Sequence, residues 1–293
     1  MIRPRRSLLF MPGSNARALE KARNLPADGI ILDLEDSVGP DAKELARDQI
    51  AQAVAARGFG RREVLIRVNA LDSPWWIDDV AMAGQARPDG ILVPKISSAR
   101  DLGVIAERLE AVDAERGIRV WAMIETARAV LHAEEIAAAA RDASVRLSGF
   151  VFGPNDISRE TRIRMLPGRA AMLPLIVHCI LATRTHGLEI LDGPYSDFSN
   201  FNGFGQECTQ ARDLGFDGKT LIHPGQIEAC NAIFTPPSDQ VAYARNIIAA
   251  FERPENVSRG AIQLDGQMVE RLHAEMAKRT IAIADAIATI GQP

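Results

Sequence analysis

The sequence has few cysteines, no glycine-rich nucleotide loop and no excess of basic residues. Its three cysteines, Cys179, Cys208 and Cys230, are far apart and form no CxxC pair, which argues against a disulfide scaffold or a structural zinc site. Neither GxGxxG nor GxxxxGK[ST] occurs, so the phosphate-binding turns of nucleotide folds are missing. The 34 basic residues are outnumbered by 38 acidic ones, which argues against binding of nucleic acid.

Long hydrophobic runs are also missing. The apolar run after the basic residues 3–6 spans only residues 8–11, too short for a signal peptide, and no later run has the roughly 20 residues that cross a membrane. Hydrophobic residues nevertheless make up 47 % of the chain and charged residues 25 %, as in soluble globular proteins. We therefore expect a folded, cytoplasmic protein that has no membrane partner.

Short β-branched runs return along the chain, and most are followed by a stretch with helical periodicity. The eight runs span residues 7–11, 29–34, 64–68, 90–93, 120–124, 149–152, 188–191 and 217–222. Parallel strands need helical crossovers, and eight of them close into a ring. The pattern therefore predicts an α/β fold of the (β/α)8 TIM-barrel type rather than an open, doubly wound sheet.

The alternation stops after His223 and Pro224. Helical stretches follow at 240–252 and about 269–290, with a loop at 260–266 that we expect to be ordered because apolar residues separate its turn-formers. The sequence therefore predicts a catalytic barrel over residues 1–225 and a C-terminal helical extension over residues 226–293.

Polar side chains stand at the ends of the predicted strands, where the active site of such barrels lies. In chain order they are Asp33, Glu35, Asp36, Arg67, Asn69, Lys95, Glu125, Asn155, Asp156, Asp192 and His223. Carboxylates that converge on one mouth repel each other, so we expect a cation beside those of the second, fifth and sixth strands. Oxygen ligands without cysteine or clustered histidine favour Mg²⁺, or Mn²⁺, over zinc.

Glu125 and Asp156, which follow adjacent strands, would suffice as metal ligands, because Mg²⁺ leaves its other positions to water and substrate. Glu35 and Asp36 would then hold the metal-bound waters. Arg67 is suited to orient a carbonyl and to hold negative charge that develops on oxygen. Backbone N–H groups near Asn155, at the start of the next helix, are expected to bind a substrate carboxylate. Lys95 completes the expected substrate-binding set.

Each of these assignments has a structural alternative. Acidic residues directly after a strand often cap the next helix, which applies to Asp36 and Asp156, and Glu125 can mark a helix start. Arg67 and Lys95 can be structural partners of the same carboxylates. These alternatives do not easily explain why the whole set stands at strand ends in one chain.

Several motifs occur in an order that is similar to a known family. They are RSLLFMPG at 6–13, DLEDSV at 33–38, RVN at 67–69, VPK at 93–95, IET at 124–126, GPND at 153–156, GFDGKTLIHPGQI at 215–227 and LDGQM at 264–268. Nearly end to end, the chain resembles the citrate lyase β-subunit (CitE-like) branch of the HpcH/HpaI aldolases. This branch also contains malyl-CoA lyases and malyl-CoA thioesterases.

The resemblance implies a homotrimer or hexamer of barrels with Mg²⁺ on Glu125 and Asp156 and with Arg67 on the reacting carbonyl. It implies that Asp265, in the C-terminal segment, reaches a neighbouring subunit's active site as an acid or base. It also places the CoA group along the first strand and helix, where the matching residues are Phe10, Pro12, Asn15, Arg17 and Lys21.

The expected reaction is a Mg²⁺-dependent carbon-carbon lyase step that cleaves a short 3-hydroxyacyl-CoA, such as malyl-, citramalyl- or citryl-CoA, to acetyl-CoA and a 2-oxo acid. Asp265 would exchange the proton at the enolate carbon. One alternative is a (3S)-malyl-CoA thioesterase that releases malate and CoA. Another is a citrate lyase β subunit that acts on a citryl thioester of an acyl-carrier protein. The basic loop 157–169 departs from the family pattern and leaves the acyl group open.

Overall fold

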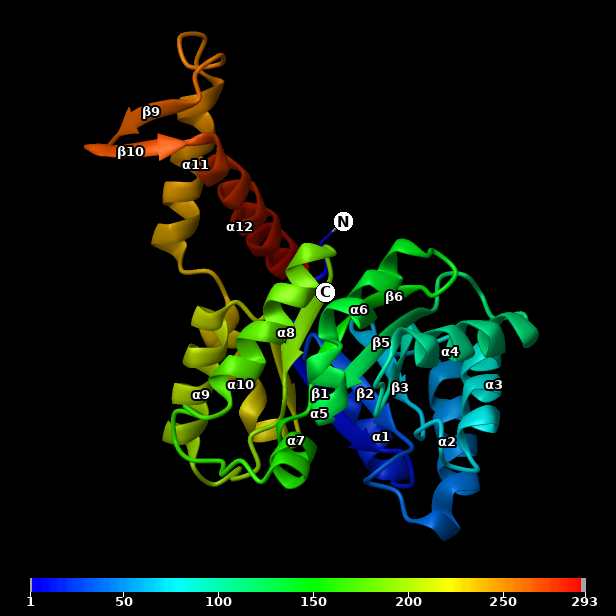
Figure 1. Ribbon diagram of the computed structural model, residues 1–293. Coiled ribbons are helices and arrows are strands. Elements are labelled where there is room, and N and C mark those ends of the chain that lie inside the picture. Colours follow the sequence, from blue (N-terminus) through cyan, green and yellow to red (C-terminus); the bar gives the residue numbers. More distant parts are fainter. Residues whose placement is uncertain (1, 291–293) are drawn as a thin grey trace. The chain divides into compact units, whose positions relative to one another are not determined.

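Eight parallel strands close into a barrel within residues 2–290, the part of the chain that the computed structural model describes (Figure 1). They pair in sequence order, and β1 also pairs with β8. The strands are β1 (Ser7–Pro12), β2 (Gly29–Asp33), β3 (Glu63–Arg67), β4 (Gly90–Val93), β5 (Arg119–Ile124), β6 (Leu147–Phe152), β7 (Glu189–Asp192) and β8 (Gly218–Leu221). The predicted TIM barrel is confirmed, and the strand bounds differ from the predicted ones by a few residues.

Helices cross over between successive strands and surround the barrel (Figure 1). The crossover helices are α1 (Ala16–Ala22), α2 (Lys43–Ala55), α3 (Trp76–Ala86), α4 (Ala99–Ala111), α5 (Ala127–Leu131), α6 (Ala133–Ala138), α7 (Pro154–Thr161), α8 (Leu173–Thr185) and α9 (Phe201–Leu214). The helix α10 (Ile227–Phe234) follows β8, and short 3₁₀ turns lie at Pro40–Ala42, Ala139–Arg141 and Pro224–Gln226. None of the helices in the described part of the chain is long and apolar enough to span a membrane.

The barrel interior contains an apolar cluster, and charged side chains lie beyond it at the carboxyl ends of the strands. Buried residues that form one interior cluster are Leu8, Ile31, Leu65, Leu92, Trp121, Met123, Val151 and Leu191. Side chains two positions apart on a strand share a face. The residues two positions after Ile31, Leu65 and Met123 are Asp33, Arg67 and Glu125, so the strand period directs these three charged side chains toward the interior at the carboxyl ends of the strands.

A second compact unit comprises residues 2–4 and 232–290, and the barrel unit spans residues 5–231. In this second unit α11 (Ser238–Glu252) packs against α12 (Arg271–Ile290), and a hairpin of β9 (Ala261–Leu264) and β10 (Gln267–Glu270) joins them. Residues from all four elements share one apolar core, formed by Ala244, Ile247, Ala250, Phe251, Ile262, Val269, Ala274 and Ala277.

The hairpin is where the helical extension differs from the expected one. The ordered loop predicted at 260–266 contributes a strand and a tight turn, because Asp265 and Gly266 both adopt positive φ, +50° and +80°. An Asp-Gly pair in this conformation matches the twist of two antiparallel strands. The two predicted helices are therefore joined by a hairpin, which was not predicted because the Asp-Gly turn signal was not used.

Candidate active site

An arginine and an aspartate on neighbouring strands form the centre of the barrel mouth. Asp33 on β2 and Arg67 on β3 are direct partners in the strand register. Arg67 donates from Nε to Asp33 Oδ1 at 2.6 Å and from Nη2 to Asp33 Oδ2 at 2.7 Å, a bidentate pair that is buried on both sides. Burial alone would raise the pKa of the Asp33 carboxyl, but the charge and hydrogen bonds of Arg67 hold this pKa below its ordinary value.

The rest of the Arg67 guanidinium is also occupied. Its Nη1 lies 2.9 Å from Glu35 Oε2 and 3.6 Å from Asp36 Oδ2. The guanidinium lies over the ring of Phe10, 4.7 Å from the ring centroid. Burial acts to lower the pKa of Arg67, but Asp33, Glu35 and Asp36 raise it above its ordinary value, so the side chain is a permanent cation.

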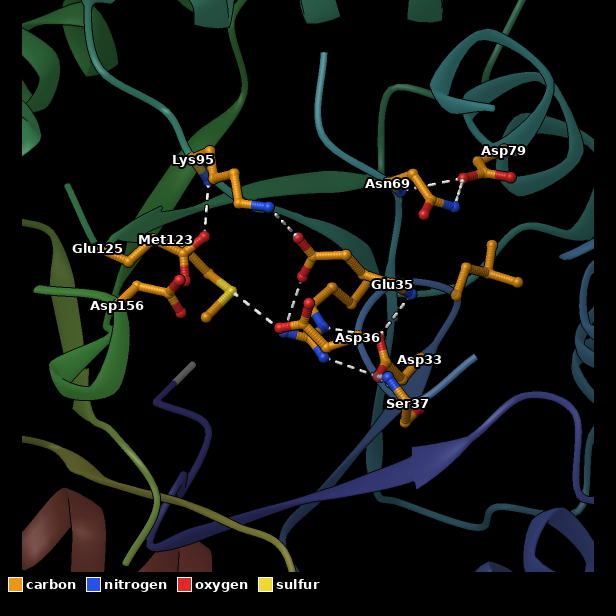
Figure 2. Close-up of polar contacts among 12 residues, drawn as sticks. Asp33, Glu35, Asp36, Ser37, Asn69, Asp79, Lys95, Met123, Glu125 and Asp156 are labelled. Atoms are coloured by element: carbon orange, nitrogen blue, oxygen red, sulfur yellow. Dashed lines mark hydrogen bonds and ion pairs between the residues drawn. The ribbon is translucent and has the colours of Figure 1, made fainter. Parts of the chain in front are cut away.

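Lys95 connects two of the predicted carboxylates. Its Nζ lies 3.2 Å from Glu35 Oε1, and its backbone N–H donates to Glu125 Oε1 at 2.8 Å (Figure 2). Lys95 has a φ of +54°, which few residues other than glycine adopt, and this turn directs its N–H toward Glu125. Glu35 is buried, and burial raises its pKa despite the two neighbouring cations.

Glu125 and Asp156 face one another at the ends of β5 and β6 (Figure 2). Gly153 permits this approach, because a Cβ at this position would lie 2.4 Å from the Cβ of Glu125. Asp156 forms an ion pair with Arg159 at 2.5 Å. Glu125 forms no ion pair with a cation among residues 2–290. Burial, with the charges of Glu35 and Asp156, raises the pKa of Glu125 to about 7.

The capping alternatives hold for some of these residues. Thr126, not Glu125, caps α5, since its side chain accepts from Ala129 N at 3.0 Å. Asp156 does lie in the first turn of α7, where a carboxylate also interacts favourably with the helix dipole. Asp36 caps no helix, because Gly39 precedes the 3₁₀ turn at Pro40–Ala42. Its exposed carboxylate lies at the mouth instead.

The donor set at the mouth fits a hard divalent cation that keeps some of its own waters. No group of three or more histidine, cysteine, aspartate or glutamate side chains within residues 2–290 is arranged to hold a metal. Mg²⁺ needs only one or two carboxylates, with water and substrate oxygens in its other positions. Glu125 and Asp156 provide two carboxylates whose mutual repulsion a cation would relieve, whereas Arg67 and Lys95 already pair with other carboxylates.

Two residues at the mouth were missed or left ambiguous at the level of sequence. Asp33 was named among the polar residues at strand ends but was assigned no role, although it is the bidentate partner of Arg67. The spacing of two residues from Ile31 would have placed Asp33 on the inward face of β2, but only once it is known that Ile31 faces inward. Lys43, at the start of α2, carried no sequence signal, yet it is buried beside the loop that contains Glu35.

The residues expected to contact CoA lie together on β1 and α1. Arg17 and Lys21 are exposed one turn apart on α1, which places them on one face of that helix. The Asn15 side chain caps the helix by accepting from Ala18 N at 3.1 Å. Phe10 and Pro12 are half-buried on β1. Contact with CoA stays a prediction for all five.

Asp265 lies at the exposed turn of the C-terminal hairpin. It belongs to the second compact unit rather than to the barrel. Its expected role as an acid or base in a neighbouring subunit therefore stays a prediction.

A cavity of about 420 Å³ lies on the β6 and β7 side of the mouth. Asn155 lines it, together with Met165–Arg169 of the basic loop, residues 194–197 after β7, and side chains of α9. The basic loop 157–169 therefore contributes its last five residues, 165–169, to the wall of the cavity that Asn155 also lines.

The fold and the mouth together define a TIM-barrel protein with buried, paired carboxylates and a fixed arginine at the carboxyl ends of its strands. Over residues 6–224 the chain matches the family described as HpcH/HpaI aldolase/citrate lyase, and it belongs to this family. The family inferred from the sequence motifs is thereby confirmed.

Relatives of the chain have more than one named activity. The chain is 45 % identical over 288 residues to a (3S)-malyl-CoA thioesterase of Cereibacter sphaeroides, covering 98 % of this chain and 97 % of the relative. It is 33 % identical over 314 residues to an L-malyl-CoA/β-methylmalyl-CoA lyase of the same species, covering 97 % and 96 %.

A solved structure extends the comparison to bound groups. The protein CitE of Mycobacterium tuberculosis, crystallised with magnesium, acetoacetate and coenzyme A, is 27 % identical and has a TM-score of 0.75. The match covers 95 % of this chain and 97 % of that protein.

The raised pKa of Glu125 generates a prediction about stability in the absence of divalent metal. At Glu125 the folded protein binds more protons than the unfolded chain at pH values between its ordinary pKa of 4.5 and about 7. Stability therefore falls as the pH rises through this window, by at most about 3 kcal/mol. Urea unfolding of the metal-free protein at pH 5 and pH 8 measures this loss. Glu125→Gln should lose much less stability over the same range, and identical profiles for the two proteins would contradict the assignment.

Proposed function

We propose that the protein hydrolyses a short hydroxyacyl-CoA thioester of the (3S)-malyl-CoA type to malate and CoA, with Mg²⁺ at Glu125 and Asp156. The observation that carries this proposal is the 45 % identity, over almost the full length of both chains, to a (3S)-malyl-CoA thioesterase. The lyase named among the relatives is more distant, at 33 % identity. The hydrolase alternative is therefore favoured over the carbon-carbon lyase expected from the sequence.

The metal would supply a Lewis acid that polarises the substrate carbonyl and lowers the pKa of a nearby water. Glu125 and Asp156 would hold it, and Glu35 and Asp36 would accept hydrogen bonds from its waters. This role agrees with the charge of the mouth, because Glu125 is buried and ion-paired to no cation within the described residues. Magnesium in the crystal structure of the related CitE supports the choice of metal.

Arg67 would stabilise the negative charge that develops on the carbonyl oxygen during attack on the thioester. Its bidentate pair with Asp33 fixes the orientation of the guanidinium, so little reorganisation is needed when charge develops. Backbone N–H groups at the start of α7, near Asn155, would bind the substrate carboxylate. Lys95 would contact the substrate, and Phe10, Pro12, Asn15, Arg17 and Lys21 would contact the CoA group.

The second candidate is the carbon-carbon lyase, because an L-malyl-CoA/β-methylmalyl-CoA lyase matches 97 % of this chain. In that reaction Arg67 would hold the enolate oxygen, and Asp265 of a neighbouring subunit would exchange the proton at the enolate carbon. A homotrimer or hexamer and a cytoplasmic location stay predictions, as does action on an acyl-carrier thioester.

Product analysis distinguishes the two reactions. Purified protein incubated with (3S)-malyl-CoA and Mg²⁺ should release free CoA and malate, and EDTA should stop the release. Chromatography resolves these products from acetyl-CoA and glyoxylate. Acetyl-CoA and glyoxylate as the main products would replace the hydrolase with the lyase, and no turnover would reject both as activities on free malyl-CoA.

The role of the Asp33–Arg67 pair has a matched control at the other end of the barrel. Asp28, equally buried, accepts from Arg6 at 2.7 and 2.8 Å in a second bidentate pair. Asp33→Asn and Asp28→Asn should both destabilise the fold, by about 3–5 kcal/mol, because each removes the charge of a buried carboxylate from a bidentate ion pair.

Only Asp33→Asn should also lower kcat, by about 10- to 100-fold, because it frees the guanidinium that faces the carbonyl. Thermal unfolding and steady-state kinetics of both variants measure the two effects. Equal activity in the two variants would mean that the Asp33 pair is structural only.

A further inference from the structure

The Asn69 side chain of the RVN motif does not face the mouth, and its partners connect it to α2. Asp79 Oδ2 accepts from Asn69 N at 2.9 Å and from Asn69 Nδ2 at 2.6 Å. Asp79 Oδ1 in turn accepts from Arg47 Nε of α2 at 3.0 Å. The remaining polar atom of Asn69, Oδ1, accepts from Lys43 Nζ at 2.6 Å.

Lys43 uses its ammonium group for three acceptors at once. Besides Asn69 Oδ1, Nζ donates to the backbone carbonyls of Leu34 at 2.6 Å and Glu35 at 2.8 Å. An ammonium has three N–H donors, so its hydrogen-bonding capacity is filled. Lys43 is buried and lies over the ring of Trp75. No donor is left for substrate, so Lys43 acts on the site only through the two carbonyls and the Asn69 side chain that it holds.

The position of Lys43 in α2 carries a cost that its contacts offset. It is the first residue of the helix, where the dipole disfavours a cation. A lysine here is therefore explained by its partners rather than by helix formation. Its two carbonyl acceptors belong to the turn that follows β2, and its amide acceptor belongs to the segment that follows β3. Lys43 thus fixes the turn that carries Glu35 relative to the strand that carries Arg67.

We propose that Lys43 is a positioning residue for the reaction assigned above: it holds the Leu34–Glu35 turn so that Glu35 meets both Arg67 and Lys95. The inference rests on the proposed function for its kinetic effect, but its structural effect is independent of any substrate. Loss of the three Lys43 hydrogen bonds would release the turn. In the folded protein its amides are protected from exchange: the Asp33 carboxylate accepts from Glu35 N and Ser37 N, and the Glu35 carbonyl accepts from Val38 N.

The test compares Lys43→Met with Arg146→Met. Arg146 is a suitable control because it is also a buried cation that donates to two backbone carbonyls, those of Ala114 and Glu115, but at the start of β6, away from the mouth. Both variants should lower Tm by similar amounts. Lys43→Met alone should lower kcat, by about 10-fold or more, with KM changed less than about 3-fold. Lys43→Arg, which keeps a cation and its donors, should recover most of kcat.

Hydrogen exchange supplies a readout that needs no substrate. In Lys43→Met the amides of residues 35–38 should exchange about 10-fold faster than in wild type, and in Arg146→Met they should not. If Lys43→Met does not fold, Asn69→Ala removes one of the three acceptors and should change exchange and kcat in the same direction.

Two results would overturn the role of Lys43: exchange at residues 35–38 that matches the control, or a kcat no lower than that of Arg146→Met. If the wild type releases no product from malyl-CoA, the proposed function fails, while the exchange comparison still decides whether Lys43 holds the turn.

Discussion

The bidentate ion pair between Asp33 and Arg67 fixes the rest of the mouth. The register of β2 and β3 sets the two residues side by side, and the period of two along each strand directs both inward, above the apolar layers that contain Ile31 and Leu65. A buried arginine without a carboxylate would be costly, so the pair has to form. With Arg67 held by Asp33, its Nη1 forms an ion pair with Glu35, and Glu35 in turn forms an ion pair with Lys95. The register of β2 and β3 thus sets the pair with which Glu35, and through it Lys95, makes contact.

The pair leaves an imbalance of charge that points to a cation. Arg67 and Lys95 pair with Asp33 and Glu35, whereas Glu125 is buried beside Asp156 and, among residues 2–290, accepts a hydrogen bond only from the backbone N–H of Lys95. This lack of positive charge around Glu125 is reflected in its raised pKa, since burial and two like charges disfavour its ionised form. A divalent ion that prefers oxygen ligands would correct this deficit if Glu125 and Asp156 held it, and it would supply a Lewis acid for a carbonyl whose negative charge Arg67 would stabilise. This arrangement serves thioester hydrolysis and retro-Claisen cleavage equally, so the choice between them depends on the relatives.

The strand order and most of the mouth could be predicted from the sequence, because eight β-branched runs and the charged residues after them are local features. Glu125, Asp156 and Arg67 were found in this way, and the structure brings them to one mouth. The roles of Asp33 and Lys43 could not be predicted in this way. The role of Asp33 depends on which face of β2 is inward, and that of Lys43 depends on a contact between α2 and two loops. The hairpin at Asp265 had a local signal, the Asp-Gly turn, that was not used. The role of Asp265 depends on a second subunit, which the pattern of one chain does not contain.

The central claim is that Glu125 and Asp156 together hold a divalent ion, and a binding titration tests it without reference to the reaction. Mn²⁺, followed by electron paramagnetic resonance, should bind the wild-type protein at one site per chain and should be displaced by Mg²⁺. Glu125→Gln and Asp156→Asn should each weaken binding by about 10-fold or more, because each removes a charged ligand at nearly constant volume. Asp142→Asn, at an exposed carboxylate that accepts hydrogen bonds from Ser144, should leave the affinity unchanged. Wild-type affinity in either mouth variant would contradict the account.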